Sequence, residues 1–137
     1  MPASAQEEKR PGINYNLPSD TVFYVAKTDR IGFLFAARTK YHPDAKFEPR
    51  SELQGNADNF SKAIAGKLVS QRFFSWSNPE GGTYDAHESN ISSDRGTFRQ
   101  LYVIDGQTVY GLISGPQKSD NEADIGRFLS TLKINKR

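Results

Sequence analysis

The sequence predicts an α+β fold in which a mainly antiparallel sheet of about six strands is flanked by two amphipathic helices. Two observations support this prediction. Short runs rich in Val, Ile, Phe and Tyr alternate with turn residues over most of the chain. Only the segments 51–70 and 125–132 carry apolar residues at three- and four-residue spacing. Because no internal repeat or linker interrupts the pattern, we expect residues 13–137 to form one domain, a layered sandwich.

Residues 1–12 are polar, contain proline and glycine, and have no periodicity, which predicts a disordered leader. Ala3-Ser4-Ala5 has the small-x-small form that signal peptidase cleaves. We therefore expect an exported protein (periplasmic, extracellular or lumenal) from which a signal peptide has been removed.

The sequence of the first half of the domain predicts two strands and a helix. Segments 21–27 and 31–41 are rich in β-branched and aromatic residues, and the polar gap between them has hairpin length. Ser51-Glu52-Leu53-Gln54 has the form of a capping box and predicts the start of a helix that runs to about Ser70. The apolar stripe of this helix consists of Leu53, Ala57, Phe60, Ile64 and Leu68.

The sequence of the second half of the domain predicts four strands and a short helix. An aromatic strand over 72–76 is followed by a polar strand over 83–92. Segments 98–104 and 107–114 flank Asp105-Gly106, a dipeptide that favours a two-residue type I′ turn, so these segments predict a hairpin. The stripe of the closing helix consists of Ile125, Phe128, Leu129 and Leu132.

The last hairpin and the closing helix resemble PsbP-like domains. The resemblance lies in FRQLYVI (98–104), VYGLI (109–113) and the ending FLSTLKI (128–134). In that family a hairpin with a tyrosine precedes a helix with the pattern F-hydrophobe-S/T-S/T-hydrophobe-K/R-hydrophobe. The order of the predicted elements matches over 13–134, whereas the residue pattern itself matches only over about the last forty residues.

The resemblance implies a layered α/β/α sandwich, an exported or lumenal location and a non-enzymatic accessory role. The name-giving members are extrinsic subunits of photosystem II, and a relative of the same fold binds a small GTPase. No metal, cofactor or partner residue of the family carries over, because none of its site motifs is present in this chain.

Composition argues against several classes of partner and site. Eighteen basic and sixteen acidic side chains are interleaved and leave a formal charge of +2, whereas a nucleic-acid-binding face is normally concentrated and basic. The chain has no cysteine, which excludes disulfides and thiolate zinc sites. No apolar run approaches the roughly 20 residues that a transmembrane helix needs.

We found no catalytic or cofactor-binding motif, so neither an enzyme nor a cofactor is expected. Ser114 is one position too late for a nucleophile elbow, G-x-S-x-G. Asp85 and His87 share one face of the polar strand, where a carboxylate beside an imidazole can bind a metal or orient a base. A divergent metal-dependent hydrolase that uses this pair is therefore one alternative hypothesis, although no further ligand motif supports it.

The candidate binding residues are Phe74, Trp76, Tyr84 and His87. Phe74 and Trp76 share a strand face and, if exposed, would form an aromatic patch. Our first hypothesis is an accessory domain that binds another protein, of unknown identity, through such a patch. The alternative is a small-ligand binder with a pocket between helix 51–70 and the sheet, near Trp76, Tyr84 and His87. The sequence leaves the oligomeric state open.

Overall fold

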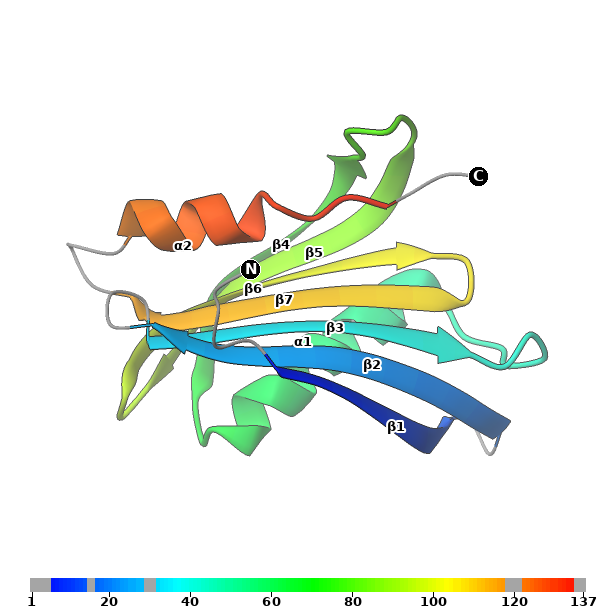
Figure 1. Cartoon of the computed structure of the whole chain (residues 1–137), viewed down its shortest axis with the longest axis horizontal. Helices are drawn as coiled ribbons and strands as arrows, with labels where there is room; N and C mark the ends of the chain where they lie inside the picture. Colours follow the sequence, from blue (N-terminus) through cyan, green and yellow to red (C-terminus); the bar gives the residue numbers. More distant parts are fainter. Residues whose placement is uncertain (1–5, 15–16, 29–31, 118–121, 135–137) are drawn as a thin grey trace.

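The computed structural model describes residues 6–14, 17–28, 32–117 and 122–134 (Figure 1). The elements in chain order are β1 (Gln6–Asn14), β2 (Leu17–Thr28), β3 (Gly32–Tyr41), α1 (Pro49–Ala63), β4 (Lys67–Ser77), β5 (Thr83–Ser93), β6 (Gly96–Asp105), β7 (Thr108–Gln117) and α2 (Glu122–Leu129). The strands form one sheet in the order β1-β2-β3-β7-β6-β5-β4, and all neighbouring pairs are antiparallel. The pairing of β3 with β7 thus joins two meanders, β1–β3 and β4–β7.

The prediction of an α+β layered sandwich is wrong, because the fold is dominated by its sheet. The described residues form seven strands of 9 to 12 residues, whereas their two helices have only 15 and 8 residues. The helix expected over 51–70 ends at Ala63, and Leu68 of its predicted stripe lies in β4 instead. The sheet also has one strand more than expected, since β1 forms within the predicted leader.

The expectation of a disordered leader over residues 1–12 is wrong from Gln6 onward. β1 pairs with β2 along its whole length, from Gln6 opposite Val25 to Asn14 opposite Leu17. A polar strand is typical of a sheet edge, where charged residues discourage pairing with other chains. Residues 3–5, which carry the expected cleavage motif, lie outside the described residues.

The start of α1 is stabilised by Glu48, not by the capping box predicted at Ser51. The Glu48 carboxylate accepts a hydrogen bond of 2.7 Å from the backbone N–H of Ser51, and this bond lowers the pKa of Glu48. Pro49 occupies the first helical position, where its missing N–H costs nothing. A carboxylate at this end also complements the helix dipole.

α1 ends in a Schellman motif. The N–H of Ala65 donates to the carbonyl of Lys62 and the N–H of Gly66 to that of Ser61. Ala65 has a φ of 52°, in the left-handed region that normally favours glycine. At Gly66 a Cβ would lie 2.6 Å from Cγ2 of Ile91, so only glycine lets the chain pass this close to β5.

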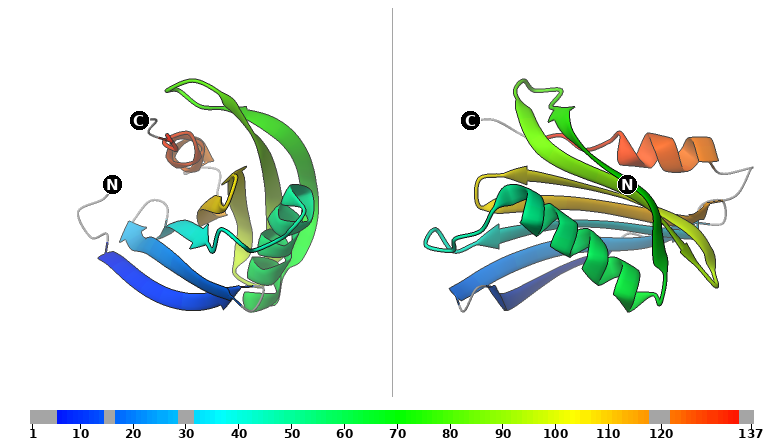
Figure 2. Two further views of the ribbon diagram at one scale, coloured as in Figure 1. Left: turned by 90° about the vertical axis from the view of Figure 1, so that its right-hand side faces the viewer. Right: turned by 180° about the vertical axis from the view of Figure 1, so that it is seen from behind.

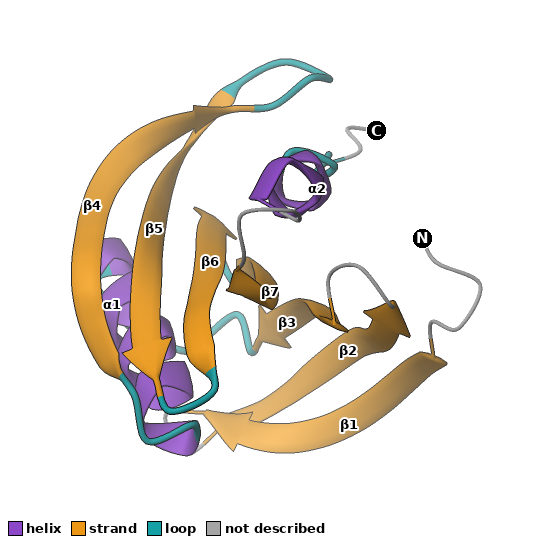
Figure 3. Cartoon of the chain, turned by 90° about the vertical axis from the view of Figure 1, so that its left-hand side faces the viewer, coloured by secondary structure: helices purple, strands orange, loops and turns teal. Residues whose placement is uncertain are grey.

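The two helices lie on opposite faces of a strongly curved sheet (Figures 2 and 3). α2 lies in the hollow of the sheet, which we call the concave face, and α1 lies against the outer, convex face. Side chains of β6 alternate between the two faces. The concave core includes Leu101, Val103, Leu112, Ile125, Phe128 and Leu129. The convex core includes Leu53, Ala57, Tyr102, Ile104, Val109 and Ile113.

The hairpin predicted around Asp105-Gly106 is present, but its turn lies one residue later. Asp105 pairs with Thr108, so Gly106 and Gln107 form the two-residue loop. Gly106 has a φ of 57°, whereas Gln107 does not have a positive φ. A single glycine with positive φ at the first loop position is the pattern of type II′, not of the type I′ turn that we expected.

Asn78, which follows β4, connects the β4–β5 turn to the segment after α2. Its side-chain amide donates to the carbonyl of Ile134 over 2.7 Å and accepts from the N–H of Ile134 over 3.1 Å. Both residues are buried. This pair of bonds closes the region beside α2 on the concave face.

Candidate functional site

Four rows of side chains cross the concave face on β4, β5 and β6. The register of the strands sets these rows, because residues paired across an antiparallel sheet point to the same face. From one end to the other the rows are Ser70–Asn90–Arg99, Arg72–Glu88–Leu101, Phe74–Ala86–Val103 and Trp76–Tyr84. The concave face therefore changes from polar to aromatic along the strands.

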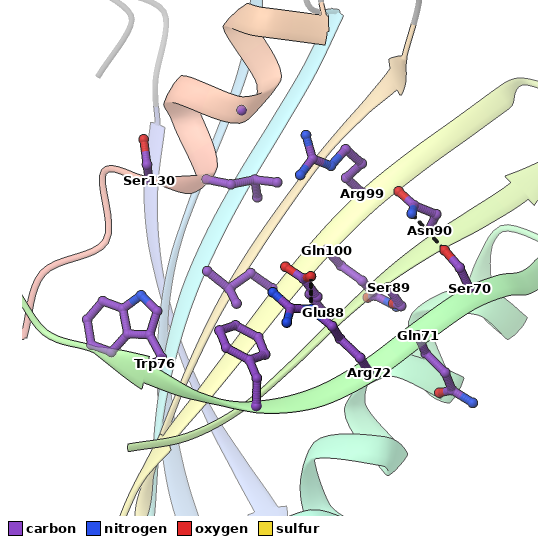
Figure 4. A pocket seen from close by; sticks show the side chains of 14 residues that line it. Ser70, Gln71, Arg72, Trp76, Glu88, Ser89, Asn90, Arg99, Gln100 and Ser130 are labelled. Carbon is purple, nitrogen blue, oxygen red and sulfur yellow. Dashed lines mark hydrogen bonds and ion pairs between the residues drawn. The ribbon is translucent and has the colours of Figure 1, made fainter. Parts of the chain in front are cut away.

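A cavity of about 360 Å³ lies between these rows and α2 (Figure 4). α2 and the residue after it supply Gly126, Leu129 and Ser130 to its wall. The volume is at the small end of the range typical of sites for small organic molecules. Figure 4 shows Gln71 pointing away from this cavity, as strand alternation requires.

The aromatic end of the cavity is formed by Phe74 and Trp76 with Leu129 from α2. The rings of Trp76 and Tyr84 lie 6.2 Å apart at an angle of 39°, within the usual range for aromatic pairs. All three rings of Phe74, Trp76 and Tyr84 are partly buried and pack against the concave core. Phe74 and Trp76 form part of the wall of the cavity, and Tyr84 packs beside Trp76, so the three rings do not form a flat, exposed patch.

An ion pair lies in the middle of the cavity. Arg72 donates to the carboxylate of Glu88 from the neighbouring strand. The Arg72 guanidinium also lies 4.6 Å above the centre of the Phe74 ring. Stacking on the ring and pairing with the carboxylate both favour this orientation of Arg72, whose side chain is 62% exposed.

The polar end is formed by Ser70, Asn90 and Arg99. The Asn90 amide donates to the Ser70 hydroxyl over 2.8 Å. Arg99 points toward α2, where its Nη1 lies 3.8 Å from the position that a Cβ on Gly126 would occupy. Arg99 is partly buried, and it forms no ion pair with any residue in the described part of the chain.

The structure brings together three of the four candidate binding residues. Phe74, Trp76 and Tyr84 lie on the concave face, whereas His87 lies on the convex face beside α1. Trp76 and Tyr84 therefore do not share with His87 the pocket that we expected between helix 51–70 and the sheet. The alternation of side chains along a strand already indicates that Tyr84 and His87 point to opposite faces, since they are an odd number of positions apart on one strand.

His87 is fully buried. Its Nε2 lies 3.0 Å from Oε1 of Gln71, and its ring lies 4.9 Å from that of Phe73 in an edge-to-face arrangement. Its Nδ1 has no hydrogen-bond partner among the residues that the structure describes. Burial lowers the pKa of His87 below the ordinary 6.5, against the opposing effect of the carboxylates of Asp58 and Glu88.

Asp85 is exposed, and no hydrogen bond or ion pair between described residues joins it to His87. Among the described residues, no group of three or more His, Cys, Asp or Glu side chains is arranged to hold a metal ion. Within the same part of the chain, neither helix has the length and apolar character that crossing a membrane requires.

Sequence reasoning missed the polar half of this cavity. Alternation along β6 would have placed Arg99 with Leu101 and Val103 on one face. The missing information was the strand register, which brings Asn90 opposite Arg99, and the position of α2 on that face. Comparison with known proteins found no matching family model, curated protein or solved structure.

Proposed function

We propose that this protein binds a small organic molecule in the cavity between α2 and strands β4–β6. The observation that carries the proposal is the cavity itself. It is partly enclosed, and it combines aromatic and aliphatic side chains at one end with polar groups at the other, which are the two kinds of group that sites for small ligands use. Such a cavity can bury the apolar part of a ligand and orient its polar part.

This proposal is favoured over binding of a protein through the aromatic residues. Phe74, Trp76 and Tyr84 are each partly buried against α2 and the concave core, so they offer a protein partner little of their surface. The protein-binding role, the exported location and the resemblance to PsbP-like domains stay predictions, and nothing in the proposal depends on them.

The proposal is also favoured over a hydrolase that uses Asp85 and His87. A general base must reach the proton that it removes, either directly or through one water. His87 is fully buried on the convex face, and the described residues include no metal-ligand cluster beside it. The geometry thus supports binding without chemistry.

The test uses the intrinsic fluorescence of Trp76, because it is the only tryptophan in the chain. A collection of small alkyl and aryl compounds is titrated into the protein, and compounds that change the Trp76 emission are then tested for a rise in the melting temperature. Binding of a ligand to the native state alone must stabilise it.

Two matched variants locate the binding. Gly126→Leu extends a side chain from α2 into the cavity, whereas Gly55→Leu makes the same change in α1, on the convex face. We expect Gly126→Leu to weaken binding about tenfold or more, a loss of at least about 1.4 kcal/mol, and Gly55→Leu to leave it unchanged. Equal weakening by both variants, or no compound that changes emission and melting temperature, would contradict the proposal.

A further inference from the structure

We infer that the ligand of this cavity is an elongated carboxylate whose head group is bound by Arg99 and whose apolar body lies against Phe74 and Trp76. The inference rests on the proposed function and names the class of ligand. Three features of the cavity carry it: an excess of positive charge, a cationic side chain that has no ion-pair partner among the described residues, and the distance between the polar and aromatic ends.

The charge of the cavity is the first feature. In the part of the chain that the structure describes, the charged residues of the wall are Arg72, Arg99 and Glu88. Glu88 is already paired with Arg72, which leaves one positive charge in excess. A partly dehydrated guanidinium is most favourable when a counter-ion joins it, so the cavity selects a ligand with a single negative charge.

The surroundings of Arg99 are the second feature. Among the described residues of the wall the only acidic side chain is Glu88, which lies one row away and is held by Arg72. On α2, Asp124 is bonded to Arg127. The guanidinium fork matches a carboxylate bidentately, and Asn90 in the same row can add a hydrogen bond after a rotation of its amide.

The geometry of the rows is the third feature. Ser70, in the row of Arg99, and Phe74 are four residues apart on β4, which corresponds to about 13 Å along a strand. Trp76 lies a further two residues along the same strand. A ligand with its carboxylate at Arg99 must therefore be extended for its apolar body to reach the ring of Phe74, and longer still to lie along the whole of Trp76, which favours an unbranched chain over a compact molecule.

The test compares decanoate with decanol, which share one alkyl chain and differ in the charge of the head group. Each is titrated below the concentration at which decanoate forms micelles, with Trp76 emission and calorimetry as independent readouts. We expect the wild type to bind decanoate about tenfold or more tightly than decanol, because only the carboxylate can form a charge-assisted bidentate hydrogen bond with Arg99.

Variants of Arg99 separate its charge from any structural role. Arg99→Gln is expected to weaken the binding of decanoate about tenfold more than that of decanol, and so to abolish the preference for decanoate. Arg99→Lys keeps the charge but loses the fork, so part of the preference should remain. Arg95→Gln is the matched control, because Arg95 is exposed in the β5–β6 turn and is not part of the cavity wall.

The possible failures are distinguishable. If the wild type binds both compounds equally, and Gly126→Leu weakens both, the cavity binds small molecules but the carboxylate inference is overturned. If Arg99→Gln weakens decanol as much as decanoate, Arg99 shapes the cavity and does not bind the head group, which also overturns it. If neither compound binds, the inference is overturned for alkyl carboxylates, and the compound collection then decides the proposed function separately.

Discussion

Gly66 donates its backbone N–H to the carbonyl of Ser61 over 2.8 Å, and this bond is possible only because Ala65 between them adopts a φ of 52°. The last turn of α1 therefore depends on an alanine in a left-handed conformation. For an L-residue this conformation raises the free energy of the folded state by about 1–2 kcal/mol, and glycine does not carry this cost.

Ala65→Gly is expected to stabilise the protein by about 1 kcal/mol, because relief of the left-handed conformation exceeds the entropy that an added glycine costs. Denaturant unfolding measures the change in the free energy of unfolding.

Gly66→Ala is the contrasting variant. Its Cβ would lie 2.6 Å from Ile91 and 2.9 Å from the Ser92 carbonyl, so we expect a loss of about 1–3 kcal/mol. Stabilisation by Gly66→Ala would show that the chain does not pass this close to β5.

Stability should decrease as the pH falls below about 6.5, the ordinary pKa of histidine, because burial lowers the pKa of His87 in the folded state. Between the two pKa values the unfolded chain binds a proton that the folded protein does not, so acid favours unfolding. At pH values above this window the effect is absent. Unfolding measured from pH 7.5 to pH 5 should reveal the decrease.

The histidine variants assign this effect. His87→Gln retains a polar side chain beside Gln71 and should reduce the dependence on pH within this window. His42→Gln removes the other histidine of the chain, which lies in the loop after β3, and should retain that dependence. The opposite pattern would mean that His87 is accessible to protons in the folded state.

Asn78→Ala is expected to destabilise the protein by about 1–3 kcal/mol, since it removes both hydrogen bonds to Ile134 and leaves buried backbone groups unpaired. Asn78→Asp keeps the acceptor for the Ile134 N–H but loses the donor to its carbonyl. We expect limited proteolysis to cleave the segment after α2 faster in Asn78→Ala than in the wild type. Unchanged cleavage and stability would contradict the role of Asn78 as the connection between the β4–β5 turn and this segment.

Gly111→Ala is expected to destabilise the protein by about 1–3 kcal/mol, because the buried ring of Tyr102 occupies the space of the new methyl group. A Cβ at Gly111 would lie 2.7 Å from Cε1 of Tyr102. Gly126→Ala is the control, since its Cβ would meet only Arg99 at an ordinary distance of 3.8 Å. Thermal unfolding of the two variants should differ clearly, and equal melting temperatures would show that the Tyr102 ring moves without cost.

The sequence predicts the parts of this fold that depend on neighbouring residues. The β6–β7 hairpin was found because its turn signal, Asp105-Gly106, is local. The sequence places the end of α1 too late because Ile64 and Leu68 continue a helical spacing, whereas in the structure Ala65 adopts a positive φ and Gly66 comes into close contact with β5 at Ile91. That contact exists only after β5 has packed beside this segment.

The same distinction applies to β1 and to the candidate site. Residues 6–12 carry no apolar alternation, and they form a strand because β2 offers them an edge. Phe74 and Trp76 could be assigned to one face by alternation alone. Arg99 could not be assigned to their site, because that step requires the register between β5 and β6 and the position of α2.

The strand order has a consequence for how the chain folds. Every sheet pairing except one joins strands that are consecutive in the chain, but β3 with β7 brings Phe33 opposite Gly115. Since closing so long a loop is entropically costly, we expect the two meanders to form first and this seam to close last. If closure of the seam limits the folding rate, Leu112→Ala should slow refolding in stopped-flow experiments, whereas Ala65→Gly should mainly slow unfolding.

During synthesis β3 is complete long before β7 emerges, so the growing chain carries an open strand edge at which it can pair with another chain.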